Sequence, residues 1–351
     1  MTLADDAAEL EAARTTNRLR QERDTARAQS ERLADELDRL QQIVGIHESA
    51  TAATPPKWLV PARAKKHHAT VCTILSDCHF DEVVRPGEIG GLNAYSRAIG
   101  ELRLRRWADR VVAITRDYVA GVDFDGVVVM LGGDIFSGAL HDLAETNEDT
   151  LPGSVLHWSA LICSALEMLA DEFGRVHVPC VVGNHGRLSS QPRTKLRARD
   201  NIDWLLGHLV ARHFSGDKRV TVSVTDDPDA FVPVYDTVHL LTHGDQTKGG
   251  GGIGGIWPPI MRMAARKQQR YAPAGRPFDI VVMGHWHQLI MAPEQGLIVN
   301  GSLKGYDEFA AHIMNARPER AQQALWLVTP EHGVTASFPV IVADPKTEGW
   351  G

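Results

Sequence analysis

From residue 69 onward, short apolar runs rich in β-branched residues alternate with segments of helical periodicity. This alternation predicts a layered α/β domain over residues 69–342, with a tail at 343–351. Helices are expected at about 94–120, 154–173, 200–214 and 257–271. The expected strands are Thr70–Leu75, Val127–Leu131, Val176–Val182, Val238–Thr242, Ile280–Met283 and Leu297–Asn300, followed by Ala324–Val328 and Val334–Val342.

The N-terminal segment, residues 1–45, has a different pattern. It is rich in Ala, Glu, Asp and Arg and has no Gly or Pro before Gly45, which predicts one long helix. A 4-3 spacing gives a coiled-coil seam that favours a homo-oligomer, although a solvated single helix fits the charges too. The seam positions are Leu19, Arg23, Ala26, Ser30, Leu33, Leu37, Leu40 and Val44. Residues 46–68, with Pro55, Pro56 and Pro61, are expected to form a linker.

The composition is that of a soluble globular protein, with 43% hydrophobic residues. We expect no apolar run of the roughly 20 residues that a membrane span needs, and the acidic N-terminus does not resemble a signal peptide. The four cysteines show no CxxC spacing, which favours reduced thiols inside the cell. We therefore expect a cytoplasmic protein without a membrane partner.

A polar motif stands directly after most of the predicted strands. The carboxyl ends of strands in an open α/β sheet converge on one crevice, so these distant motifs are expected to form one site. The motifs are Asp77-Cys78-His79, Gly133-Asp134, Gly183-Asn184-His185, His243-Gly244-Asp245 and Gly284-His285-Trp286-His287.

These residue types suit two divalent cations. Carboxylate oxygens and imidazole nitrogens bind Mn²⁺, Fe²⁺, Zn²⁺ or Mg²⁺, of which we expect Mn²⁺. Two neighbouring cations need a bridging carboxylate, and Asp134, between Gly133 and the apolar pair Ile135-Phe136, suits that bridge.

The ordered series DxH, GD, GNH, H and GHxH resembles the calcineurin-like metallophosphoesterase superfamily over about residues 70–305. The resemblance implies a β-sandwich flanked by helices in α-β-β-α layers. It also implies that Asp77, His79 and His287 hold one metal, that Asn184, His243 and His285 hold the other, and that Asp134 bridges both.

The expected reaction is in-line attack on phosphorus by a hydroxide that bridges the two metals, with Asp134 and Asn184 in the catalytic set. His185 is expected to serve the leaving oxygen. Where the family usually follows GNH with Asp or Glu, this chain has Gly186, so the acid that would orient His185 is missing there, and Asp81 or Asp245 are candidates to substitute for it.

Basic residues near two of these motifs are candidates for substrate contacts. They could line a groove for a phosphate backbone, or they could be ordinary solvated faces. The net charge of −7 is unusual for a nucleic-acid binder, but metals would neutralise the site carboxylates. The candidates are Arg187, Arg193, Lys195, Arg197, Arg199, Arg262, Arg266 and Lys267.

Within the superfamily, the chain looks most like SbcD-type DNA repair nucleases and phage-borne phosphoesterases, although residues 305–351 are too few for the DNA-capping domain of SbcD-type enzymes. We therefore expect a metal-dependent phosphodiesterase, a nuclease acting on DNA in a bacterial or phage-infected host cell. The alternatives are a phosphatase or phosphodiesterase of small, including cyclic, nucleotides, and a non-catalytic nucleic-acid-binding or assembly module.

Overall fold

The computed structural model describes residues 19–35, 57, 67–138, 147–247 and 255–350. The chain divides into two compact units, residues 1–54 and 55–351. In the first unit, residues 19–35 form one exposed helix, with an ion pair of 3.2 Å between Arg27 and Glu31. Leu19 and Leu33 of the predicted seam are both exposed. Leu37, Leu40 and Val44, the rest of the predicted helix and most of the predicted linker lie outside the described residues, so the coiled coil stays a prediction.

The second unit is built on two sheets. The first has the order β11-β10-β1-β2-β3-β4 and the second the order β5-β6-β7-β9-β8. In the first sheet β1 to β4 are parallel, and in the second β6, β7 and β9 are parallel. The strands are β1 (His68–Leu75), β2 (Asp123–Leu131), β3 (Val176–Cys180), β4 (Val220–Val224), β5 (Asp229–Val234), β6 (Thr237–Thr242), β7 (Ile280–Met283), β8 (Ile290–Ala292), β9 (Leu297–Val299), β10 (Gln322–Thr329) and β11 (Gly333–Ile341).

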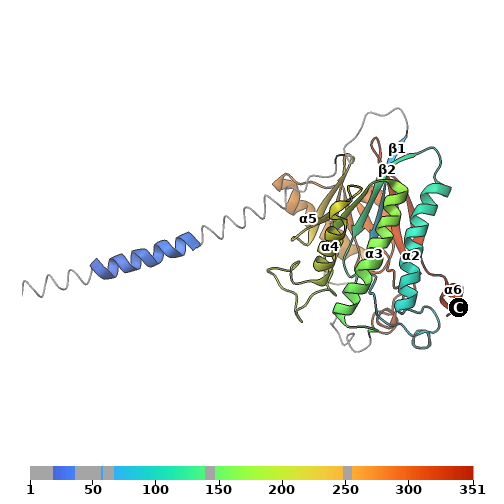
Figure 1. Cartoon of the computed structure of the whole chain (residues 1–351), viewed down its shortest axis with the longest axis horizontal. Helices are drawn as coiled ribbons and strands as arrows, with labels where there is room; N and C mark the ends of the chain where they lie inside the picture. The colour runs from blue at the N-terminus through green and yellow to red at the C-terminus, as the bar shows by residue number, and fades with distance from the viewer. Residues whose placement is uncertain (1–18, 36–56, 58–66, 139–146, 248–254, 351) are drawn as a thin grey trace, which may run out of the picture. The chain divides into compact units, whose positions relative to one another are not determined.

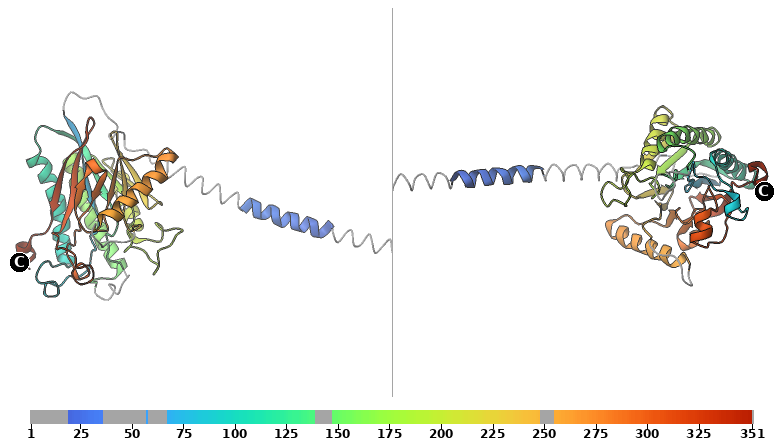
Figure 2. Two further views of the ribbon diagram at one scale, coloured as in Figure 1. Left: turned by 180° about the vertical axis from the view of Figure 1, so that it is seen from behind. Right: turned by 90° about the horizontal axis from the view of Figure 1, so that it is seen from below.

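Helices cover the outer face of each sheet. Helices α2 (Arg97–Ala113), α3 (Leu151–Phe173) and α4 (Ile202–His213) lie side by side on one face (Figure 1). Helix α5 (Trp257–Tyr271) lies on the opposite side of the sheets (Figure 2). The predicted β-sandwich with α-β-β-α layers is confirmed. The chain ends in α6 (Pro345–Glu348), and shorter turns are η2 (Pro86–Glu88), η3 (Ile114–Tyr118), η5 (Phe214–Gly216), η6 (Ala272–Ala274), η7 (Pro293–Gln295) and η8 (Phe309–Ile313).

Side chains that point alternately to the two faces of each strand produce the packed layers of the domain. In β2, Val127 and Val129 face the layer of α2 to α4, whereas Val128 and Met130 face the second sheet. In β7, Val282 faces the first sheet, and its neighbours Val281 and Met283 pack with α5. Because both faces of these strands are buried, their sequences are continuous apolar runs, typical of covered parallel strands. Such runs made these strands predictable.

Helix α3 corrects one expectation. It is long and apolar enough to cross a membrane by length and composition, so the prediction that no apolar run reaches that length is wrong. Half of its most apolar window is buried inside the domain, and the helix packs against α2, α4, β2 and β3. The apolar length of α3 therefore reflects a helix covered on several sides.

Three strands were not predicted. Strands β4 and β8 are short and mostly half-buried, so they lack a clear apolar run, and β5 is interrupted by Pro233. The predicted tail also contains structure, because the side chain of Glu348 in α6 is fully buried and forms a 2.7 Å ion pair with Arg103 of α2. This pair ties the C-terminus to the helical layer.

Candidate metal centre

Parallel strands deliver the five motifs to one edge of the sandwich. Asp77 follows β1, Asp134 follows β2 and Asn184 follows β3, while His243 and His285 follow β6 and β7 of the second sheet. Backbone hydrogen bonds join the loops: Asp77 N–H donates to Gly133 O at 3.1 Å. The structure thus brings all seven predicted ligands to the same end of both sheets.

The backbone at these positions is strained. Of the nine described non-glycine residues with positive φ, five are predicted metal ligands. Left-handed backbone costs energy for ordinary side chains, and its concentration at one place marks a site whose geometry the fold imposes. The values are +52° for Asp77, +45° for His79, +50° for Asp134, +70° for His285 and +53° for His287.

Glycines allow the loops to meet closely. A Cβ on Gly183 would overlap the carboxylate of Asp134, and one on Gly284 would overlap that of Asp77. The GNH and GHxH motifs therefore need glycine because a ligand carboxylate already fills the adjacent space.

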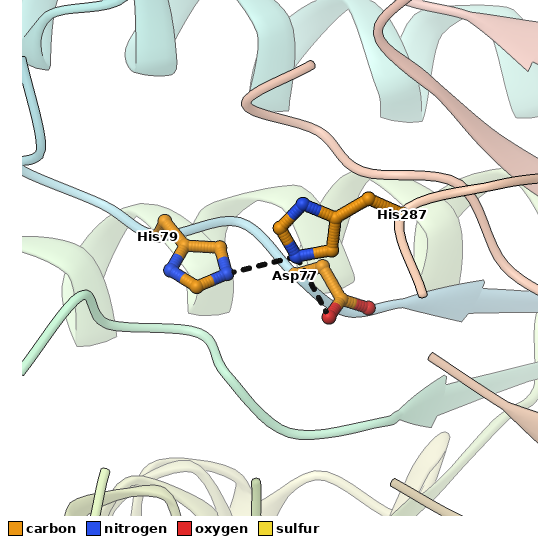
Figure 3. Close-up of side chains that lie close together, drawn as sticks. All are labelled: Asp77, His79 and His287. Atoms are coloured by element: carbon orange, nitrogen blue, oxygen red, sulfur yellow. Dashed lines mark hydrogen bonds and ion pairs between the residues drawn. The ribbon is translucent and has the colours of Figure 1, made fainter. Parts of the chain in front are cut away.

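The first ligand set consists of Asp77, His79 and His287, which point toward one another in Figure 3. Their ligand atoms lie within 4.8 Å of one another. His79 Nε2 is 3.1 Å from His287 Nε2, which is 3.4 Å from Asp77 Oδ1. Burial and the charge of Lys304 hold the pKa of His79 well below its ordinary value, so its ring is neutral. A neutral imidazole is the form that binds a metal.

The second set consists of Asp134, His243 and His285, again within 4.8 Å. His243 Nε2 lies 2.9 Å from Asp134 Oδ2 and 3.2 Å from Asn184 Oδ1. Its Nδ1 donates to Gly132 O at 2.9 Å, which directs Nε2 at the site. Asp134 also groups with His79 and His185, so this carboxylate borders both sets.

The ionisable groups of the second set strongly shift one another's pKa values. Burial lowers the pKa of His243, but the carboxylate of Asp134 raises it, to about 10. Burial likewise raises the pKa of Asp134, and His243 and His185 bring it well below its ordinary range. The pKa of His285 is lowered to about 4 by burial and by His243. Oxygen and nitrogen donors, buried and aimed at one another, fit divalent cations once His243 has lost its proton.

His185 is oriented by the backbone. Its Nδ1 donates to Ser137 O at 3.1 Å, and its own N–H donates to Asp134 Oδ1 at 2.7 Å. Neither suggested acid takes this role: Asp81 binds Arg97 at 2.6 Å, and Asp245 pairs with Arg197. A backbone carbonyl therefore contributes to the orientation of His185.

The sequence reasoning missed one supporting residue, Asp203. Its buried carboxylate accepts N–H bonds from Asp134 at 3.0 Å, Ile135 at 3.3 Å and Gly183 at 2.9 Å, so it joins the GD and GNH loops. Burial and the nearby Asp134 raise the pKa of Asp203 to about 6. The available signal was Asn201, an N-cap two residues earlier that marks the start of α4.

The predicted substrate-binding residues differ in how accessible their charged groups are to a substrate. Lys267 is buried, with its ammonium 2.6 Å from both oxygens of Asp229, so the structure gives its predicted substrate contact no support. Arg187 donates to the Asn184 carbonyl at 3.0 Å and stabilises the loop. In the segment after the GNH motif, residues 193–199, which we call the arginine arm, three arginines pair with acids: Arg193 with Asp200 at 3.0 Å, Arg197 with Asp245 and Arg199 with Asp226 at 2.6 Å. Lys195 of this arm is exposed, and so are Arg262 and Arg266 of α5.

No protein-family model matches this chain. No curated protein matches it either. Among solved structures, vacuolar protein sorting 29 from Cryptosporidium parvum matches with 12% identity and a TM-score of 0.32, over 77% of this chain and 98% of that one. A conserved uncharacterised protein, a predicted phosphoesterase from Streptococcus pneumoniae, matches with 14% identity and a TM-score of 0.28, over 79% and 99%.

A third structure is Vps29 from Entamoeba histolytica in complex with Zn²⁺, with 11% identity and a TM-score of 0.31, over 77% of this chain and 99% of that one. TM-scores and identities this low do not bear on activity. The chemistry of the site rests on the chain's own residues.

Proposed function

We propose that this chain is a metal-dependent phosphodiesterase that uses two divalent cations. The observation that carries the proposal is the pair of ligand sets bordered by the single carboxylate of Asp134. Asp77, His79 and His287 would hold one cation, and Asn184, His243 and His285 the other. The mixed oxygen and nitrogen donors suit Mn²⁺, with Zn²⁺, Fe²⁺ and Mg²⁺ as alternatives.

Bound divalent cations would supply Lewis acidity, which activates water and neutralises phosphoryl charge. The protein residues do the rest. Asp134 is fixed through both oxygens, because Oδ1 accepts from His185 N and Oδ2 contacts His243. His185, whose Nδ1 proton is donated to Ser137 O, would exchange a proton with the leaving oxygen. This role requires no covalent enzyme intermediate.

We further propose that the ester belongs to nucleic acid, with DNA as the first candidate. Support comes from α5, where Arg262, Arg266 and Arg270 recur every four residues on an exposed face. Such spacing places them on one side of the helix, and no described acid forms an ion pair with Arg262 or Arg266. The arginine arm after the GNH motif gives weaker support for a nucleic-acid contact, because Arg193, Arg197 and Arg199 already pair with acids.

The test is a panel assay with Mn²⁺ on the full chain, with Asp134→Asn purified in parallel as the control for contaminating nucleases. The panel compares single-stranded DNA, duplex DNA, RNA, cyclic nucleotides and a phosphomonoester. We expect turnover of phosphodiesters by the wild type alone. Turnover of small nucleotides without DNA cleavage would favour the small-nucleotide alternative. Failure on every ester would leave only a binding or assembly role.

A second experiment addresses DNA directly. Arg262→Ala/Arg266→Ala should weaken duplex binding and reduce the log-log salt slope by roughly 0.9 per lost phosphate contact. Arg105→Ala/Arg110→Ala, which removes two exposed arginines from α2, is the matched control. Hydrolysis of a small artificial diester should stay unchanged in both. Equal salt slopes in both variants and the wild type would remove α5 from the DNA interface.

A further inference from the structure

A buried carboxylate stands behind the first ligand set. Glu82 follows His79 by three residues, and its side chain is only 8% exposed. Its Oε1 accepts from Lys304 Nζ at 2.7 Å, and its Oε2 accepts from Ser137 Oγ at 2.7 Å. Lys304 also contacts Asp307, so two carboxylates share one ammonium and the cluster keeps a net negative charge. A buried excess negative charge is costly unless a positive group lies nearby.

A cation bound to the first ligand set, on the far side of the His79 ring, would supply this positive charge. His79 Nδ1 is buried and has no hydrogen-bond partner among the residues that the structure describes, and Glu82 Oε2 lies 3.6 Å from it. The other ring nitrogen, Nε2, faces His287 in the ligand set. If Nε2 binds a cation, the ring proton must be on Nδ1, directed at Glu82. Histidines that bind metals generally donate this second N–H to a carboxylate or carbonyl, which fixes the ring.

We propose that Glu82 is a positioning residue that accepts the Nδ1 proton of His79 and sets this ring for the first cation, with Lys304 holding Glu82 in place. This inference rests on the proposed metal-dependent function. Ser137 extends the arrangement, because its hydroxyl donates to Glu82 while its carbonyl accepts from His185 Nδ1. Ser137, in the loop after β2, thus contacts both the carboxylate next to His79 and the ring of His185.

The experiment titrates the full-length chain with Mn²⁺ and follows the two binding events by calorimetry. Glu82→Gln keeps the shape of the side chain and removes its charge, and we expect one event to weaken by about 10- to 100-fold while the other is unchanged. Ser137→Ala, which keeps the carbonyl to His185, should weaken the same event by less. It serves as the second variant if Glu82→Gln folds poorly.

The chain offers a closely matched control. Asp229 is a buried carboxylate with Lys267 Nζ at 2.6 Å and the Tyr271 hydroxyl at 2.7 Å, the same group types that surround Glu82. Asp229→Asn should cost stability and leave both binding events unchanged. Wild-type affinity for both events in Glu82→Gln would overturn the proposal, and so would an equal effect of Asp229→Asn.

The outcomes also separate this inference from the proposed function. A wild type that binds two Mn²⁺ ions but hydrolyses no ester would end the proposed activity, while a selective defect in Glu82→Gln would still support the positioning role. A wild type that binds no divalent cation would overturn both.

Discussion

Gly186 should be intolerant of any side chain, including the acid that the sequence resemblance leads one to expect there. A Cβ at this position would overlap Asn201 Oδ1 and lie 3.2 Å from both Asn201 Cγ and Asp203 Cγ. Asn201 cannot easily move: its amide donates to Gly183 O at 2.7 Å, and its Oδ1 accepts from Asp203 N at 2.8 Å. The asparagine that caps α4 therefore excludes the acid.

The expected cost follows from this overlap. Forcing an extra carbon into a packed interior typically destabilises by about 1–3 kcal/mol. For a domain of this size each 1 kcal/mol corresponds to roughly 2–4 °C, so Gly186→Ala should lower Tm by about 2–12 °C. The measurement is thermal unfolding of the purified chain followed by circular dichroism.

A double-mutant cycle identifies the cause. Asn201→Ala alone should cost about 1 kcal/mol through loss of the helix cap. Because it also removes the overlapping atom, the double variant should lose less stability than the sum of the single variants, by about 0.5–3 kcal/mol. Additive losses would refute the steric reasoning, and a Gly186→Ala variant as stable as the wild type would refute the overlap itself.

Three further predictions concern the metals and the N-terminus. Asp134→Asn should abolish ester turnover and lower metal content, measured by elemental analysis, since one carboxylate borders both ligand sets; full activity would contradict the assignment. Metal affinity should rise with pH, by at most about tenfold per unit, because His243 has a pKa of about 10 without metal and must lose its proton to bind. Calorimetry in buffers of different ionisation enthalpy should detect that proton, and a pH-independent affinity would argue against it. Removing residues 1–45 should leave the catalytic domain folded and reduce the oligomeric state by light scattering; equal oligomeric states would favour the single solvated helix.

The sequence revealed the features that are local in the chain. Motifs such as Gly133-Asp134 directly follow continuous apolar runs, so strand and candidate ligand were found together. Strand β8, by contrast, has only three residues, all half-buried, and its sequence shows no alternation strong enough to predict it.

Long-range pairs could not be read in this way. Arg197 and Asp245 are 48 residues apart, and Glu82 and Lys304 are separated by 222, so no spacing rule connects them. The arginine arm therefore looked basic in sequence, although three of its side chains are paired with acids in the fold. Asp203 escaped notice for the same reason, because its partners lie on loops formed by residues 20 to 69 positions earlier.

The left-handed backbone of the ligand residues also has an evolutionary consequence. Each of Asp77, His79, Asp134, His285 and His287 occupies a conformation that glycine or asparagine adopts with less strain. A descendant that no longer needed the proposed function would gain stability by exchanging these residues, so the site should decay quickly once selection on it stops. Retention of all five side chains in this left-handed backbone is unfavourable for stability, and the proposed function would offset that cost.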